Sequence, residues 1–134
     1  MSKATKNIEQ TVTIGAEPSR VYAALMDSGQ HSAFTGEPAQ IDPQKGGAFT
    51  CYDNYILGLT LELEPGKRIV QAWRSRNWPA GTYSIVTFKL AKKTGGKTLL
   101  RFSQVGVPAK DFAEKSKGWR SHYWVRLNRF FRAT

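Results

Sequence analysis

The stretch from Trp119 to Phe131 constrains the fold of this chain more than any other segment. At the α-helical step of about 100° per residue, its large apolar side chains fall on one arc, which carries Trp119, Tyr123, Trp124, Leu127, Phe130 and Phe131. The opposite side carries His122, Arg126, Arg129 and Arg132. A helix with such an aromatic stripe must bury it against an extended surface, and much of the preceding chain has the alternation of half-buried strands. The sequence therefore predicts a sheet curled around one C-terminal helix.

The chain before this helix is predicted to contain one strand, two short helices and then about six strands. Residues 8–14 alternate between apolar and polar, Pro18 suits the first turn of a helix, and Ser28 is a candidate cap for a second helix that ends near Phe34. Turn-forming residues then separate strands expected over residues 48–52, 57–64, 67–75, 82–90 and 98–105. This order predicts an α+β fold with a curved antiparallel sheet.

Length and composition favour one globular domain. With 134 residues, 40% hydrophobic residues and 12% aromatic residues, the chain is expected to form a single domain over residues 8–134. Residues 1–7 lack the apolar segment of a secretion signal and are expected to form a flexible tail. No apolar run is long enough to span a membrane. The single cysteine, Cys51, is compatible with a reducing compartment, so a cytoplasmic location is expected.

Seven short motifs resemble one protein family in their order and spacing. They are Ala33-Phe34-Thr35, Pro38-Ala39, Gly46-Gly47-x-Phe49, Ile69-Val70-x-x-Trp73-Arg74, Trp78-Pro79-x-Gly81, Gly106-Val107-Pro108 and Gly118-Trp119-x-x-x-Tyr123. From about Ile8 to Phe131 the chain resembles the C-terminal domain of the heat-shock-protein-90 ATPase activator and its bacterial single-domain homologues, in the START-like (SRPBCC) superfamily. The resemblance implies a helix-grip fold, in which a curved antiparallel sheet wraps a long C-terminal helix and often leaves a cavity between them.

A cavity between sheet and helix is the first candidate site, and it would bind a small hydrophobic or amphipathic ligand. The helix would contribute Trp119, Tyr123, Leu127 and Phe130, and the sheet would contribute Phe49, Cys51, Leu59, Leu61, Trp73, Val86, Phe88 and Phe102. The polar groups of Trp73 and Tyr123 would orient a mostly apolar ligand. The alternative role of each of these residues is packing in the core, and alternation alone does not say which strand face meets the helix.

The sequence favours a non-enzymatic protein without a metal or another cofactor. His31, Cys51 and His122 are far apart and lack the spacing of zinc ligands. Cys51 has no recognisable base nearby in sequence, so a small buried hydrophobe is the preferred interpretation of it. General acid–base catalysis would need a carboxylate or histidine that faces the cavity, and no convergent pair is evident. A cyclase-type enzyme, known elsewhere in the superfamily, remains an alternative.

The other alternative is a module that binds a chaperone or another acidic protein through a basic surface. The formal net charge is +10, and no acidic residue follows Glu114. The candidate contact residues are Arg74, Arg76, Trp78, Arg126 and Arg129. Ordinary solvated charge is the competing explanation, and no nucleic-acid-binding motif accompanies the charge. The resemblance covers only the activator's C-terminal domain, whereas its N-terminal domain supplies much of the chaperone binding. The oligomeric state is left open.

Overall fold

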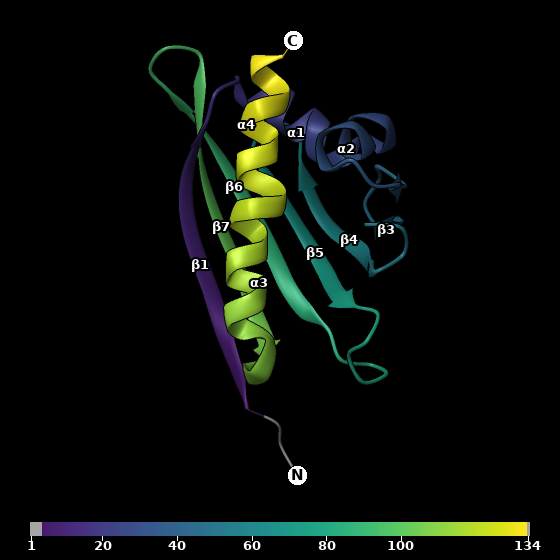
Figure 1. The fold of residues 1–134 in the computed structure, drawn as a ribbon. Helices are drawn as coiled ribbons and strands as arrows, with labels where there is room; N and C mark the ends of the chain where they lie inside the picture. Colours follow the sequence, from purple (N-terminus) through teal and green to yellow (C-terminus); the bar gives the residue numbers. More distant parts are fainter. Residues whose placement is uncertain (1–3, 134) are drawn as a thin grey trace.

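The computed structural model describes residues 4–133 and shows one curved sheet wrapped around a C-terminal helix (Figure 1). Strand β1 (Thr5–Ile14) precedes helices α1 (Pro18–Met26) and α2 (Ser28–Thr35). The later strands are β2 (Gln40–Ile41), β3 (Ala48–Cys51), β4 (Ile56–Glu64), β5 (Arg68–Ser75), β6 (Ser84–Lys93) and β7 (Lys97–Pro108). The helical end comprises η1 (Ala109–Asp111), α3 (Phe112–Gly118), the π-helical segment η2 (Trp119–Trp124) and α4 (Val125–Arg132).

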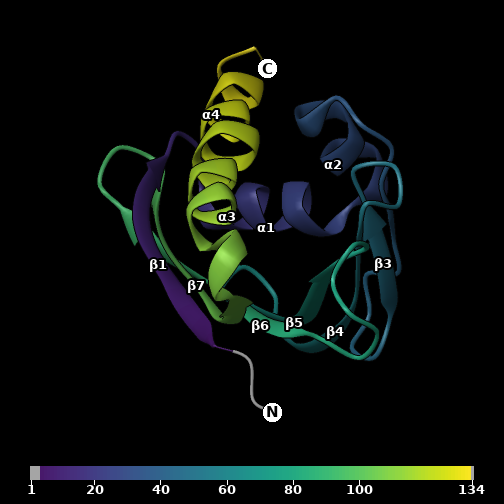
Figure 2. The same ribbon diagram turned by 60° about the horizontal axis from the view of Figure 1, so that its bottom comes forward.

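All neighbouring strands pair antiparallel, in the order β1-β7-β6-β5-β4-β3-β2. Figure 2 shows the sheet curving around the space that holds the C-terminal helix, with α1 and α2 on the same side of the sheet as that helix. This arrangement is the helix-grip fold, and it confirms the predicted α+β class. The two short helices after the first strand and the six strands that follow them are confirmed as well.

The concave face of the sheet and the C-terminal helix form one core. Side chains from alternate positions of three central strands are almost fully buried there, among them Ile69, Trp73, Val86, Phe88, Leu100 and Phe102. From the helix, Trp119, Tyr123, Trp124, Leu127 and Phe131 are buried against them, whereas Phe130 is half-buried. The predicted aromatic stripe is therefore the centre of the core.

The prediction that Leu59 and Leu61 face the helix is wrong. Their side chains are 45% and 38% exposed on the outer face, whereas Thr60 between them is fully buried. Gly58 alternates onto the inner face with Thr60, and the Phe49 ring occupies the space of a side chain there: a Cβ atom at Gly58 would lie 2.4 Å from Phe49 Cζ. A bulge between Thr60 and Glu62 then ends the simple alternation.

Two predicted boundaries change in the structure. Strand β1 starts at Thr5, which pairs with Pro108, so the expected tail over residues 1–7 overlaps the sheet; residues 1–3 of that tail lie outside the described residues. The cap of α2 is Asp27, whose carboxylate accepts a hydrogen bond from the Gln30 N–H at 2.9 Å. Ser28 instead binds the backbone of Ile41, whose N–H donates to Ser28 Oγ at 2.8 Å.

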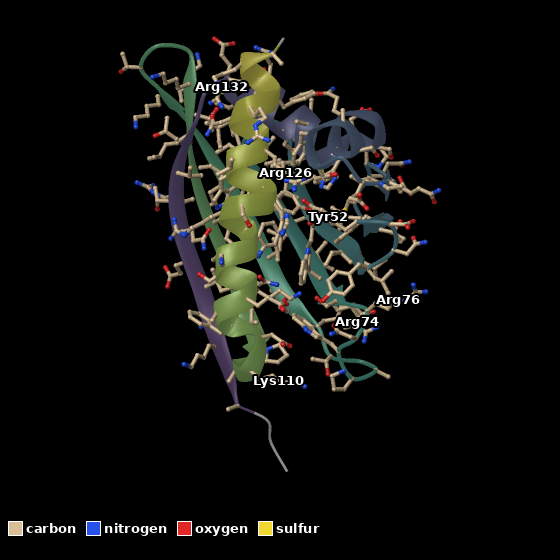
Figure 3. The ribbon with its side chains drawn as sticks, in the orientation of Figure 1. Tyr52, Arg74, Arg76, Lys110, Arg126 and Arg132 are labelled. Atoms are coloured by element: carbon tan, nitrogen blue, oxygen red, sulfur yellow. The ribbon has the colours of Figure 1, made fainter. Side chains whose placement is uncertain are left out.

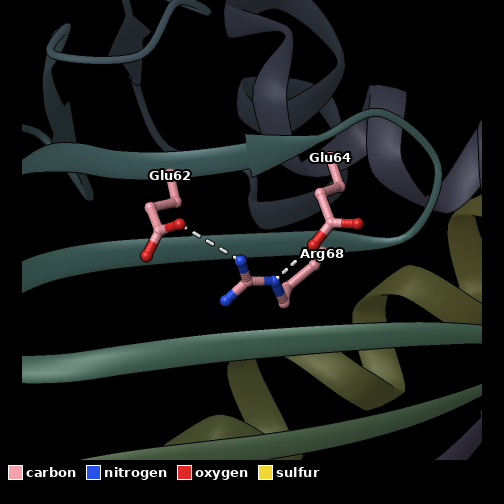
Figure 4. Close-up of polar contacts among 3 residues, drawn as sticks. All are labelled: Glu62, Glu64 and Arg68. Atoms are coloured by element: carbon pink, nitrogen blue, oxygen red, sulfur yellow. Dashed lines mark hydrogen bonds and ion pairs between the residues drawn. The ribbon is translucent and has the colours of Figure 1, made fainter.

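The β4–β5 hairpin carries an exposed group of charges on its surface. Arg68 Nε lies 2.7 Å from Glu64 Oε1, and Arg68 NH2 lies 3.2 Å from Glu62 Oε1 (Figure 4). The chain has 20 Lys and Arg residues against ten acidic residues, so cations also outnumber acids outside this group.

Candidate functional site

The interior between sheet and helix is filled by aromatic rings. The centroids of Trp119 and Phe102 are 4.3 Å apart, and those of Trp119 and Tyr123 are 4.5 Å apart. A void of about 10 Å³ remains, beside Phe49, Cys51, Trp73, Phe88 and other core residues. That volume is about one water molecule. The predicted cavity residues Val86, Phe102, Leu127 and Phe130 line neither this void nor the open cleft described next. The residues expected to hold a ligand in the interior therefore mostly pack against one another.

An open cleft of about 390 Å³ lies next to this filled interior, between the β3–β4 loop and the helix at α3 and η2. We call it the aromatic cleft, and its lining consists of Tyr52, Tyr55, Ile56, Trp73, Glu114, Lys115, Gly118, Trp119, His122 and Tyr123. Three of the predicted cavity residues reach it, namely Trp73, Trp119 and Tyr123. The structure thus moves the candidate site from the core to its edge.

The β3–β4 loop forms one wall of the aromatic cleft in a strained backbone conformation. Tyr52, Asp53 and Asn54 all have positive φ, at 51°, 54° and 69°. Such left-handed residues other than glycine each cost about 1–3 kcal/mol and persist where surrounding contacts hold them. Here the Tyr52 hydroxyl donates to the His122 carbonyl at 2.8 Å, and burial raises the pKa of Tyr52 to about 12. The loop is thereby attached to η2 across the cleft.

The opposite wall is the π-helical segment. The Val125 N–H donates to the carbonyl of Arg120, five residues earlier, so the turn is wider than in an α-helix. In an α-helix, side chains four apart drift by about 40° around the axis. The wider turn reduces this drift and brings Trp119 and Tyr123, which are both buried, closer to one line along the helix. Short π-helical segments of this kind are frequent at functional sites.

The indole groups of this helix are bound to the sheet rather than free for a ligand. Trp119 Nε1 donates to Gln104 Oε1 at 2.7 Å, and Gln104 Nε2 donates to Ser84 Oγ at 2.9 Å. Ser84 Oγ in turn donates to the carbonyl of Trp73 at 2.9 Å. This buried chain of hydrogen bonds fixes the helix over the sheet and positions both tryptophans that line the cleft.

Lys115 is a buried cation in the wall of the aromatic cleft. Its residue exposure is 9%, and its Nζ lies 4.9 Å from the centre of the Tyr55 ring and 5.9 Å from that of Trp73. Nζ also donates to the Tyr55 hydroxyl at 3.3 Å and lies 3.3 Å from Glu114 Oε1. A lysine at this position would ordinarily be expected at the surface. Its spacing of four residues from Trp119 is the signal that places it on the buried side.

Beneath the cleft, the structure brings together His31 and Cys51, which are far apart in the sequence. His31 Nε2 lies 3.7 Å from Cys51 Sγ and 3.1 Å from the Tyr123 hydroxyl. Burial lowers the pKa of His31 to about 4, raises that of Cys51 to about 12 and raises that of Tyr123 well above its ordinary value. At neutral pH the group is therefore uncharged. Within residues 4–133, no three His, Cys, Asp or Glu side chains converge as metal ligands would.

The predicted partner-binding residues are scattered, and three of them have structural contacts. Arg74 donates to the carbonyls of Trp78, Pro79 and Thr82, and it therefore fixes the loop before β6. Trp78 is buried, with its ring 5.6 Å from that of Trp73. Figure 3 shows Arg74 and Arg76 away from Arg126 and Arg132 on the helix, so they do not form one patch.

Of the two predicted partner residues on the helix, Arg126 has a structural contact and Arg129 is exposed. Arg126 NH1 donates to the carbonyl of Thr35 at the end of α2. Arg76 and Arg129 are thus the two predicted partner residues with exposed side chains.

Comparison with known proteins relates this chain to one family. The family model described as "Activator of Hsp90 ATPase homolog 1-like protein" matches residues 15–132. An uncharacterized protein of Schizosaccharomyces pombe is 33% identical over 91% of this chain and 36% of its own length. The human activator of 90 kDa heat shock protein ATPase homolog 1 is 29% identical over 89% of this chain and 35% of its own length. The chain therefore spans about a third of the length of these curated relatives.

Solved structures share the fold. The crystal structure of an HSP90 activator from Plasmodium falciparum matches with a TM-score of 0.84 and 22% identity, over 97% of both chains. A Mesorhizobium loti protein matches with a TM-score of 0.83 and 20% identity, over 96% of this chain and 98% of that one. No helix within the described residues is long and apolar enough to cross a membrane.

Proposed function

The chain belongs to the family of activator of Hsp90 ATPase homolog 1-like proteins, and we propose that it is a non-enzymatic member that binds a small, mostly apolar molecule in the aromatic cleft. The lining of that cleft carries the proposal. Five aromatic side chains, Tyr52, Tyr55, Trp73, Trp119 and Tyr123, surround a volume of about 390 Å³. Small-molecule sites typically have about 300–1,000 Å³, apolar and aromatic walls and a few polar groups.

The chemistry beneath the cleft supports binding over catalysis. A general base or a nucleophilic thiolate needs a pKa near the working pH. Burial keeps the thiol of Cys51 protonated and keeps His31 neutral with its Nε2 already beside Tyr123. A cyclase-type enzyme would have to use Glu114 or His122, which line the cleft but are exposed to water. Turnover abolished by Glu114→Gln or His122→Gln would contradict the non-enzymatic proposal.

Thermal unfolding in the presence of lipophilic compounds tests the proposed site. A compound that occupies the cleft stabilises the folded state and raises the melting temperature in a saturable way, and native mass spectrometry detects the adduct. Tyr55→Ala removes an aromatic ring from the rim of the cleft and should abolish this shift. Tyr83→Ala is the matched control, because Tyr83 is also an exposed tyrosine, at 48% against 39%, but lies outside the cleft. Equal shifts in both variants would place the ligand elsewhere.

A second candidate is a protein-interaction module for a chaperone or another acidic partner, in a cytoplasmic setting. Relatives that are activators of 90 kDa heat shock protein ATPase, and the net charge of +10, favour it. The exposed side chain of Arg129 lies on a helix that has no acidic residue after Glu114. The chain spans about a third of the length of those relatives. The second candidate function is therefore binding to the partner, and activation of a chaperone ATPase would be tested separately.

Binding to purified 90 kDa heat shock protein tests the second candidate. Arg129→Glu should weaken binding, and the effect should shrink as the salt concentration rises from about 0.05 M to about 0.3 M, because screening shortens the range of exposed charges. Arg101→Glu makes the same charge change at an exposed position on β7 and should leave binding unchanged. If both variants bind as the wild type does, the basic helix face is not the contact surface.

A further inference from the structure

The position of Lys115 indicates which class of molecule fits the aromatic cleft. Lysine is almost never buried without a partner, because removing an ammonium from water is costly. Lys115 is nevertheless only 9% exposed, and it projects among aromatic side chains rather than into solvent. Of the cleft's lining residues, Glu114 is the single acid. The cleft therefore combines apolar walls with one buried cation, Lys115, and one exposed acid, Glu114.

The contacts that Lys115 makes within the described chain leave it under-compensated. An ammonium group has three donors, and its two polar contacts, with Tyr55 Oη and Glu114 Oε1, are both long at 3.3 Å. The Glu114 side chain is 73% exposed, so water screens this ion pair. Adjacent residues of a helix do not face each other, so Glu114 reaches Lys115 from the outside of the helix. The cleft side of the ammonium is bordered by the rings of Tyr55 and Trp73.

We infer that the aromatic cleft selects an amphipathic anion, whose carboxylate or sulfonate group pairs with Lys115 while its apolar body lies against the rings of Trp73, Trp119 and Tyr123. This inference rests on the proposed function and adds the charge of the ligand to it. The incoming anion replaces Glu114 as the partner of Lys115, and the exposed glutamate returns to water. An ion pair inside the cleft has less water around it, so it is screened less than the exposed pair it replaces. The net charge of +10 also raises the local concentration of anions around the protein.

Two matched ligand pairs test the charge of the ligand by isothermal titration calorimetry. One pair is 2-naphthoate and 2-naphthamide, and the other is decanoate and decanamide, so that each pair differs only in its head group. The wild-type protein should bind at least one anion about tenfold more tightly than its amide. Lys115→Met keeps the apolar stem and removes the charge, so it should bind the anion and the amide equally. Lys117→Met, at an exposed position of the same helix outside the cleft lining, should keep the preference.

Glu114→Gln provides a second variant that does not alter the buried lysine. Removing the competing carboxylate should tighten anion binding more than it changes amide binding. Equal affinity of anion and amide in the wild type would overturn the inference while the proposed cleft remained a binding site. The inference would also be wrong if the preference persisted in a folded Lys115→Met protein. No binding by either pair would overturn the proposed function along with the inference.

Discussion

At the scale of single residues, His31 shows how burial makes folding stability depend on pH. Its pKa is lowered from the ordinary value of 6.5 to about 4 by burial, so the folded protein binds fewer protons than the unfolded chain between these values. Stability contributed by the neutral imidazole is therefore present above about pH 6.5 and is lost as the pH falls toward 4. Between pH 7 and pH 5 we expect a loss of about 2 kcal/mol in the free energy of unfolding, measured by urea denaturation.

Two histidine variants separate this effect from the titration of other groups. His31→Leu has no imidazole to titrate at this position, so its stability should change less than that of the wild type over the same pH range. His122→Gln replaces the exposed histidine and should retain the full dependence. An equal loss in the wild type and in His31→Leu would show that other groups cause the acid sensitivity.

Substitution by alanine is expected to have opposite effects on stability at Gly58 and at Gly29. A Cβ at Gly58 would lie 2.1 Å from the carbonyl oxygen of Ala72, which belongs to the paired backbone of β5 and cannot move away cheaply. Gly58→Ala should destabilise the protein by about 1–3 kcal/mol or more. At Gly29 in α2 the nearest atom is 3.4 Å away, and Gly29→Ala should stabilise by about 0.5 kcal/mol by restricting the unfolded chain. Thermal unfolding measures both, and equal signs would contradict the packing argument.

The sequence could not have shown which polar residues meet in the core. His31 and Cys51 are twenty positions apart on a helix and a strand, and Tyr123 comes from the far end of the chain. Nothing in local periodicity links three such positions. Lys115 was predictable in part, because it lies four residues before Trp119 on a helix, but lysine is so seldom buried that its type outweighed its position.

At the scale of elements, periodicity predicted which segments form helices and strands but not always which face is buried. The aromatic stripe from Trp119 to Phe131 was strong enough to identify the helix that the sheet encloses. Alternation in β4 predicts two faces but does not say which one is buried. The more apolar face, with Leu59 and Leu61, lies outside. On the inner face the Phe49 ring occupies the space of a side chain at Gly58, and such a tertiary contact cannot be read from one strand.

The contact between the β3–β4 loop and η2 should control local opening of the helix. Tyr52→Phe removes the hydroxyl that donates to the carbonyl of His122, while the ring contacts remain. One hydrogen bond of this type contributes about 1 kcal/mol. We expect the backbone amides of residues 119–125 to exchange hydrogen faster, whereas amides in β6 and β7 stay protected. Tyr83→Phe is the control, and equally fast exchange throughout the chain in Tyr52→Phe would indicate global destabilisation instead.

At the scale of the whole molecule, the helix-grip architecture was predictable and the open volume was not. The order of strands and helices, together with the motifs from Ala33 to Tyr123, was sufficient for the fold. Whether a cavity remains depends on how ring volumes fill the space, and here Phe102, Trp119 and Tyr123 fill the centre and leave the cleft at its edge. Volume is a property of the assembled core, so no single segment encodes it.

The charge of the whole molecule leads to a prediction about salt. The chain has 20 Lys and Arg residues against 10 Asp and Glu residues, and Arg68 lies beside two of those acids on the β4–β5 hairpin. An excess of like charge destabilises the compact state through repulsion. Sodium chloride screens this repulsion, with a screening length of about 10 Å at about 0.1 M.

We therefore expect the melting temperature at neutral pH to rise as sodium chloride increases from about 0.02 M to about 0.3 M. Chloride is preferable to sulfate, because sulfate also stabilises folded proteins through exclusion from their surface. Replacing two exposed cations by acids, in Arg129→Glu with Arg132→Glu, lowers the repulsion and should make the rise smaller. A melting temperature that falls with salt would mean that attractive ion pairs outweigh repulsion. In that case the surface charges would stabilise the folded state, and neutralising the basic helix face with an acidic partner would not be expected to raise the melting temperature.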